Sequence, residues 1–135
     1  MDRIRQIFDS HPKPASDAGD EAFALVQAAS ECAHACTTCA DACLEADDPG
    51  PLRKCIRLNQ DCAGICFLVG QLISRPGPQD SHLLQAQLDA CAAACKACAE
   101  ECEAHGDRMA HCRICAEACH ACARACEVMK ARLVA

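Results

Sequence analysis

The chain has 135 residues, of which 16 are Cys, and its net charge is −6 with neutral histidines. The length fits a single domain. The acidic balance, without any basic cluster, excludes a nucleic-acid partner, which would need a basic face. So much cysteine is typical of secreted disulfide proteins rich in loops and aromatic residues. This chain instead has long Ala-rich stretches, no Trp, no Tyr and 3 Phe, which predicts an all-α protein.

The first residues, MDRIRQIFDSHPKPASD, show no apolar signal-peptide core, no cleavage site of small residues and no twin arginine. No later stretch reaches the roughly 18 consecutive apolar residues that a membrane span needs. We therefore expect a cytoplasmic location without a membrane partner. We also expect reduced thiols, because the cytoplasm opposes disulfides.

The chain divides into a short arm and one bundle domain. Residues 1–16 form the arm and linker, in which a short apolar pattern of Ile4, Ile7 and Phe8 precedes the helix-breaking run HPKPASD. Residues 17–135 form the bundle domain. We expect a small N-terminal helix or arm attached to this domain.

Four long helices are predicted in the bundle domain, because Pro and Gly clusters separate stretches of good helix formers. They cover about residues 17–45, 51–74, 79–105 and 107–133. Ser16 or Asp17 can cap the first helix, and Pro51 suits the start of the second. Gly106 is placed like a C-terminal glycine and Asp107 like the next N-cap. The short connections predict an antiparallel up-down-up-down four-helix bundle.

Cysteine recurs along these helices at alternating spacings of three and four residues. This period of about 3.5 residues marks the helix face that packs against other helices. The motif C-x3-C-x2-C-x3-C occurs three times, at Cys32–Cys43, Cys91–Cys102 and Cys115–Cys126. All the thiols are therefore expected in the core, as a thiol column. Its members are Cys32, Cys36, Cys39, Cys43, Cys55, Cys62, Cys66, Cys91, Cys95, Cys98, Cys102, Cys112, Cys115, Cys119, Cys122 and Cys126.

The predicted topology gives the bundle two different ends. One, the apolar end, gathers Leu25, Val69, Ile73, Leu84, Leu88, Met129 and Leu133. The other, the mouth, gathers His105, Met109 and His111 beside Cys43, Cys55, Cys102 and Cys112. Imidazole and thioether both bind copper. We expect the three non-cysteine residues of the mouth to act as metal ligands where ions enter.

Metal binding explains the thiol column better than packing or disulfides do. Small buried Cys would make a poor apolar core, and cysteines along one helix are badly oriented for disulfides. Thiolates select soft metals, chiefly Cu(I), with Zn²⁺ and iron–sulfur clusters as rivals. The spacing does not match the C-x2-C-x2-C-x3-C-P run of iron–sulfur proteins.

Charge favours Cu(I) over zinc. Zn²⁺ in a ratio of one to every four thiolates would leave half of the thiolate charge uncompensated in a buried core, whereas one Cu⁺ per thiolate leaves none. We therefore predict a store for multiple Cu(I) ions. A multi-zinc thiolate protein and a thiol redox protein remain the alternatives. Enzyme activity is not expected, because the sequence shows no nucleophile–base pair outside the metal residues and no phosphate-binding loop.

The Cys-lined helices with repeated C-x3-C pairs resemble the bacterial copper storage protein family, over about residues 17–133. The resemblance implies many Cu(I) ions along the inside of a bundle, His or Met at its mouth, and a homotetramer. Lacking an export signal, the chain resembles the cytosolic members. A partner that would receive the copper, such as a copper chaperone or a cuproenzyme, is left open by the sequence.

Five other polar residues lie on or beside the core-facing positions. Asn59 stands where the pattern would place a Cys and departs from the family pattern. We expect the others, His34, His82, His120 and Asp61, at the surface.

Overall fold

Five α-helices make up most of the chain, and the computed structural model describes residues 2–12 and 19–134. A short helix, α1, precedes four long ones. The helices are α1 (Asp2–Asp9), α2 (Gly19–Leu44), α3 (Arg53–Ile73), α4 (Ser81–Glu103) and α5 (Ala110–Val134), with a 3-10 turn at Gly50–Leu52. The described residues contain no strand, so the predicted all-α class is confirmed.

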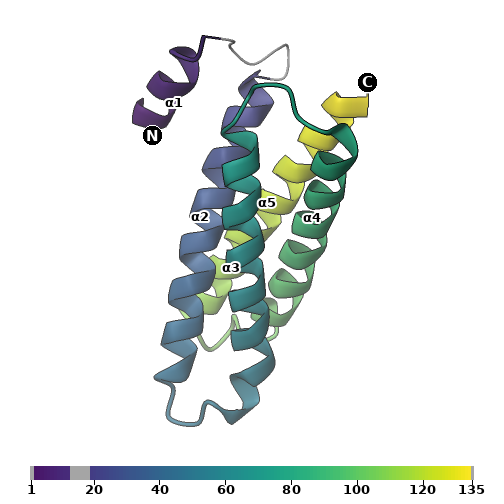
Figure 1. The fold of residues 1–135 in the computed structure, drawn as a ribbon. Coiled ribbons are helices and arrows are strands. Elements are labelled where there is room, and N and C mark those ends of the chain that lie inside the picture. The colour runs from purple at the N-terminus through teal and green to yellow at the C-terminus, as the bar shows by residue number, and fades with distance from the viewer. Residues whose placement is uncertain (1, 13–18, 135) are drawn as a thin grey trace.

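The four long helices run antiparallel, each joined to the next by a short turn (Figure 1). Helix α2 packs against α3 and α5, and α4 packs against the same two helices, so α2 lies diagonally opposite α4. The turns α2–α3 and α4–α5 lie at one end, at the bottom of Figure 1, and the turn α3–α4 lies at the other. The predicted up-down-up-down four-helix bundle is therefore confirmed.

Most helix ends agree with the sequence pattern to within a few residues. Pro51 lies in the 3-10 turn that leads into α3. Asp80 caps α4, because its side chain accepts a hydrogen bond of 2.9 Å from the backbone N–H of Leu83. The proposed caps Ser16 and Asp17 lie outside the described residues.

The prediction that Gly106 ends α4 as a C-terminal glycine and that Asp107 caps α5 was wrong. The N–H of Gly106 bonds the carbonyl of Glu103 at 3.2 Å, and no glycine in residues 2–12 and 19–134 has a positive φ. The carbonyl of His105 then accepts from the N–H groups of Arg108 (3.2 Å) and Met109 (3.1 Å). The chain therefore continues in right-handed turns through this segment. Helix α5 begins only at Ala110, so Asp107 is not its N-cap.

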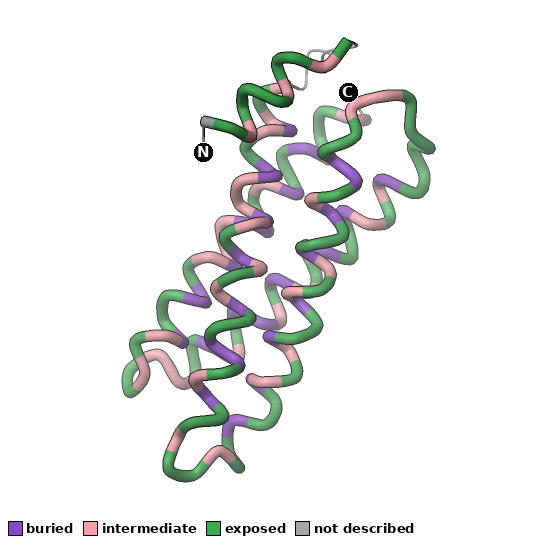
Figure 2. Tube along the Cα trace, turned by 60° about the vertical axis from the view of Figure 1, so that its left-hand side comes forward, coloured by how far each residue is buried: buried purple, intermediate pink, exposed green. Residues whose placement is uncertain are grey.

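The core-facing sides of the helices are buried along the whole bundle (Figure 2). All sixteen cysteines are at most 1% exposed. The apolar end is buried as predicted, apart from Leu133, which is half-buried and packs against the core. Among the described residues, no helix is both long enough and apolar enough to cross a membrane.

Helix α1 lies beside the upper end of α2, away from the mouth (Figure 1). Phe8 meets Phe23 edge to face, with ring centroids 6.4 Å apart. Arg5 forms an ion pair with Asp20 at 3.0 Å and lies 4.9 Å from the ring centre of Phe23. These contacts attach the short helix α1 to the start of α2. The division into an arm of residues 1–16 and a domain of residues 17–135 stays a prediction.

Candidate metal centre

The thiol column is continuous through the bundle core, and all sixteen of its cysteines are free. Along single helices, Cys32–Cys36 and Cys62–Cys66 have sulfur–sulfur distances of 3.9 Å. Between helices the distances range from 3.6 Å, for Cys36–Cys119 and for Cys55–Cys102, to 4.0 Å for Cys36–Cys98. The sulfurs therefore meet about as closely across helices as along them, because the core is narrow enough for small side chains from facing helices to touch.

The sulfurs form groups in which the ligand atoms all lie within 4.8 Å of one another, and some cysteines belong to two groups. Only some groups draw one thiol from each helix, as isolated zinc layers would require. Cys32 belongs to one such layer and also to a second group, so its sulfur can bridge ions in both. The groups include Cys32/Cys66/Cys95/Cys122, Cys32/Cys36/Cys62/Cys119, Cys36/Cys98/Cys115/Cys119 and Cys39/Cys55/Cys102. Shared thiolates suit polynuclear binding of a soft ion better than separate sites.

Asn59 occupies a fully buried position within the column. Its Oδ1 accepts hydrogen bonds from the thiols of Cys98 at 3.0 Å and Cys115 at 3.2 Å. Its Nδ2 donates to the sulfur of Cys55 at 3.6 Å. The amide therefore takes the place of a thiol on α3 and holds its neighbours in fixed positions, since a buried amide must satisfy its own polar atoms.

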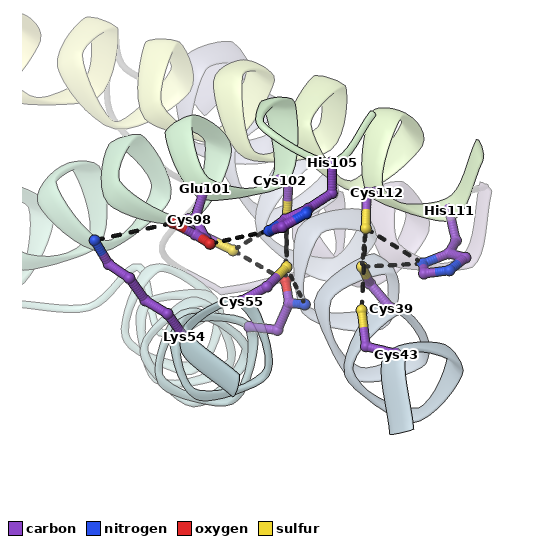
Figure 3. A network of polar contacts seen from close by, with 11 residues as sticks. Cys39, Cys43, Lys54, Cys55, Cys98, Glu101, Cys102, His105, His111 and Cys112 are labelled. Atoms are coloured by element: carbon purple, nitrogen blue, oxygen red, sulfur yellow. Dashed lines mark hydrogen bonds and ion pairs between the residues drawn. The ribbon is translucent and has the colours of Figure 1, made fainter. Parts of the chain in front are cut away.

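His111 is the mouth residue that the structure brings against thiols (Figure 3). Its Nδ1 lies 3.4 Å from the sulfur of Cys39 and 3.6 Å from that of Cys112. Cys39 and Cys43 come from the end of α2, and Cys112 from the start of α5. Together the four side chains make a compact group of three sulfurs and one nitrogen.

His105 is held by a carboxylate instead (Figure 3). Its Nε2 donates to Oε2 of Glu101 at 3.1 Å, and Oε1 of Glu101 lies 3.9 Å from Nζ of Lys54. The His105 side chain is only 11% exposed, and its Nδ1 is buried without a hydrogen-bond partner. Because a carboxylate accepts and cannot donate, the neutral ring keeps its hydrogen on Nε2 and its lone pair on Nδ1. This is the arrangement that orients metal-binding histidines.

The two α2 thiols nearest the mouth differ in protonation. Hydrogen bonding by Cys102, aided by Cys55 and His111, lowers the pKa of Cys39 to about 5. Burial raises the pKa of Cys43 to about 12, and the negative charge of Cys39 adds to this effect. At neutral pH the mouth therefore presents a Cys39 thiolate, the form that binds metal, beside a protonated Cys43.

The candidate metal centre therefore offers sixteen buried thiols in one column. Thiolates are ligands that select soft metals. The chain matches the family model described as copper storage protein over residues 18–131. It belongs to the copper storage protein family.

Three solved structures of similar proteins agree with this family assignment. The copper storage protein Ccsp from Streptomyces lividans, loaded with 10 copper equivalents, is 36% identical with a TM-score of 0.91, covering 95% of this chain and 98% of its own. A cytosolic copper storage protein from Streptomyces lividans with five coppers is 41% identical with a TM-score of 0.80, covering 84% and 97%. The Cu(I)-bound copper storage protein BsCsp3 is 34% identical with a TM-score of 0.73, covering 82% and 98%. The family resemblance predicted from the sequence is confirmed.

The remaining singled-out residues lie away from the column. His34, His82 and Asp61 are exposed, and His120 is partly exposed and paired with Glu103. Met109 is half-buried and packs against the core, although its sulfur has no described contact with a thiol.

Sequence reasoning missed Glu101 and Lys54. The i, i+4 spacing of Glu101 and His105 on one helix was the signal that could have found the first of them.

Proposed function

We propose that this chain binds and stores multiple Cu(I) ions on the thiolates of its core. The observation that carries the proposal is the thiol column itself, with sixteen free and buried cysteines in overlapping groups. Family membership supports it, as do the copper-loaded structures of similar proteins. The role is storage or detoxification, in which the protein holds its cargo without transforming it.

Charge and shared ligands together favour about one Cu(I) per Cys. A thiolate that bridges two ions, each bound by two thiolates, gives equal numbers of metal and sulfur and a neutral core. Zn²⁺ in the same core would leave net negative charge buried, which is costly without compensation. Separate tetrahedral zinc sites would also need four ligands for each ion, whereas Cys32, Cys36, Cys39 and Cys119 each belong to two groups. The multi-zinc alternative is therefore disfavoured.

We propose the mouth as the point of entry. The apolar end is filled by buried Leu, Ile and Val side chains, including Leu25, Val69 and Leu88, each at most 1% exposed. At the mouth, His111 already touches two thiols, and Nδ1 of His105 is buried without a hydrogen-bond partner. Met109 is proposed as a weaker thioether ligand between them. Ions would pass from these side chains to Cys39, Cys43, Cys102 and Cys112.

Location, assembly and partners belong to the same proposal. The similar Streptomyces lividans protein is described as cytosolic, and we propose the cytoplasm for this chain as well. A homotetramer is proposed from the family resemblance. A copper chaperone or a cuproenzyme would be the natural recipient if the stored copper is delivered.

Counting reactive thiols before and after anaerobic Cu(I) loading tests the proposed function. The apo protein, opened with denaturant, should expose all sixteen thiols to a thiol reagent. After loading, almost none should react, because Cu(I) holds each as a thiolate. A protein with a redox-active pair would protect only about two thiols. That outcome would contradict storage and favour the thiol redox alternative.

A further inference from the structure

The mouth contains a four-ligand group whose composition differs from that of the core groups. Cys39, Cys43, Cys112 and His111 have ligand atoms that all lie within 4.8 Å of one another. The thiols are buried, while His111 is only partly buried and borders the solvent. Three sulfurs and one imidazole nitrogen form the Cys₃His set that is typical of structural zinc sites. The core groups described above are made of sulfur alone.

The distances suit a tetrahedral ion. With metal–sulfur bonds of about 2.3 Å and a metal–nitrogen bond of about 2.0 Å, tetrahedral edges are about 3.8 Å between sulfurs and about 3.5 Å between sulfur and nitrogen. The sulfur–sulfur distances are 3.8 Å for Cys39–Cys112 and 4.0 Å for Cys43–Cys112. Nδ1 of His111 lies 3.4 Å and 3.6 Å from the sulfurs of Cys39 and Cys112.

Charge separates this group from those of the core. A divalent ion bound by three thiolates and one neutral imidazole carries a net charge of −1 beside the solvent. The same ion on four thiolates carries −2, and in the middle of the column that charge would be buried and costly. The mouth is therefore the place in this bundle where a zinc-class ion has a full set of ligands at an acceptable electrostatic cost.

We propose that Cys39, Cys43, Cys112 and His111 form a binding site for one divalent zinc-class ion per chain, occupied while the column is empty of copper. Binding takes the thiols as thiolates, and their protons pass to water. Cu(I) prefers thiolates and consumes the same three sulfurs. Loading therefore expels the divalent ion into solution, without any change in oxidation state. This site goes beyond the proposed store, since a copper store needs no divalent ion.

Co²⁺ is the probe for this site, because tetrahedral cobalt–thiolate centres absorb visible light. The apo protein, kept anaerobic, should bind one Co²⁺ per chain with a tetrahedral spectrum, and Zn²⁺ or Cu(I) should bleach it. The variants His111→Ala and Cys43→Ser each remove one ligand and should weaken Co²⁺ binding at least about tenfold. His120→Ala is the matched control, since His120 lies on the same helix but pairs with Glu103. It should bind Co²⁺ as the unaltered protein does.

Cu(I) capacity and circular dichroism measured on the same samples separate this proposal from the store. A folded His111→Ala protein that has lost the cobalt spectrum, beside a His120→Ala protein that keeps both the spectrum and its Cu(I) capacity, would establish the site. Three results would overturn it: no tetrahedral spectrum, saturation at about four Co²⁺ per chain, or a spectrum that His111→Ala leaves intact. A failure of Cu(I) loading with intact cobalt binding would instead contradict the proposed store alone.

Discussion

His105 depends on Glu101 for its orientation. The bond from Nε2 to the Glu101 carboxylate leaves Nδ1 as the atom that would bind a metal, and Lys54 lies within ion-pair distance of the same carboxylate. Removing the carboxylate frees the ring to rotate and to change tautomer. Glu101 is therefore proposed as a positioning residue, which would act on copper through His105.

Replacing Glu101 with Ala should slow Cu(I) uptake about tenfold or more, because outer ligand partners have effects of that size on metal sites. Glu101→Gln should retain most of the rate, since its side-chain carbonyl can accept the same hydrogen bond. Stopped-flow uptake of Cu(I) by the apo protein measures both. The effects of Glu101→Ala and His105→Ala should not add in the double variant. Full additivity, or an unchanged rate for Glu101→Ala, would show that the pair does not work together.

Asn59 provides a test of the column at one position. Asn59→Cys adds a thiol on α3 where three cysteine sulfurs already surround the amide oxygen. Cu(I) capacity should rise by about one ion per chain, by the same charge argument as for the other thiolates. The apo protein should lose on the order of 1 kcal/mol of stability with its hydrogen bonds. Metal analysis after loading decides, and an unchanged or lower capacity would contradict the expectation.

At the scale of the helices, the proposal gives the two ends of the bundle different roles. The double variant His105→Ala/His111→Ala should slow both uptake and removal of Cu(I), with a nearly unchanged capacity, because the store is the thiol column. The control is His34→Ala/His82→Ala, which removes two exposed histidines from other positions. Wild-type rates in the mouth variant would mean that these histidines only cap the turn. A large loss of capacity would place them in the store itself.

The sequence predicted which face of each helix is buried, and this was enough to predict the fold. The alternation of three and four residues determines the position of every cysteine around its helix, so all sixteen were placed in the core correctly. It does not determine how far each helix slides past its neighbours. For that reason the close contact of Cys36 with Cys119 across helices could not be predicted.

The turn between α4 and α5 shows a second limit. Gly106 and Asp107 have the residue types of a glycine stop and an N-cap, yet the chain continues in right-handed turns to Ala110. The residue types of a turn limit which backbone conformations are possible there. The packing of the two long helices determines which of these conformations joins them. The pairing of His105 with Glu101 was missed because it needed the rotamers of both side chains.

For the molecule as a whole, burial of many thiols links stability to pH. Burial raises the pKa of Cys43 from 9.0 to about 12, and it also raises the pKa of Cys112. A raised pKa stabilises the fold below the unfolded-state value, and this stabilisation is lost as pH rises from 9.0 toward 12. Cys39, with its pKa lowered to about 5, is ionised throughout that window and does not offset the loss.

The apo protein should therefore be helical at neutral pH, held by its apolar end, and should melt at progressively lower temperature above pH 9.0. The copper-loaded protein should change far less, because its thiolates are already ionised and neutralised by metal. Thermal unfolding followed by circular dichroism at several pH values measures both forms. Equal alkaline sensitivity of the two, or a random-coil apo spectrum at neutral pH, would contradict this account.

The stoichiometry of Cu(I) binding tests the central claim most directly. Apo protein is titrated anaerobically with Cu(I) against a competing chelator, and the bound copper is measured after the excess is removed. One ion per thiolate predicts about 16 Cu(I) per chain, since only that ratio leaves the core of sixteen thiolates neutral. Saturation at about four ions per chain would contradict the account and return the core to separate four-thiolate sites.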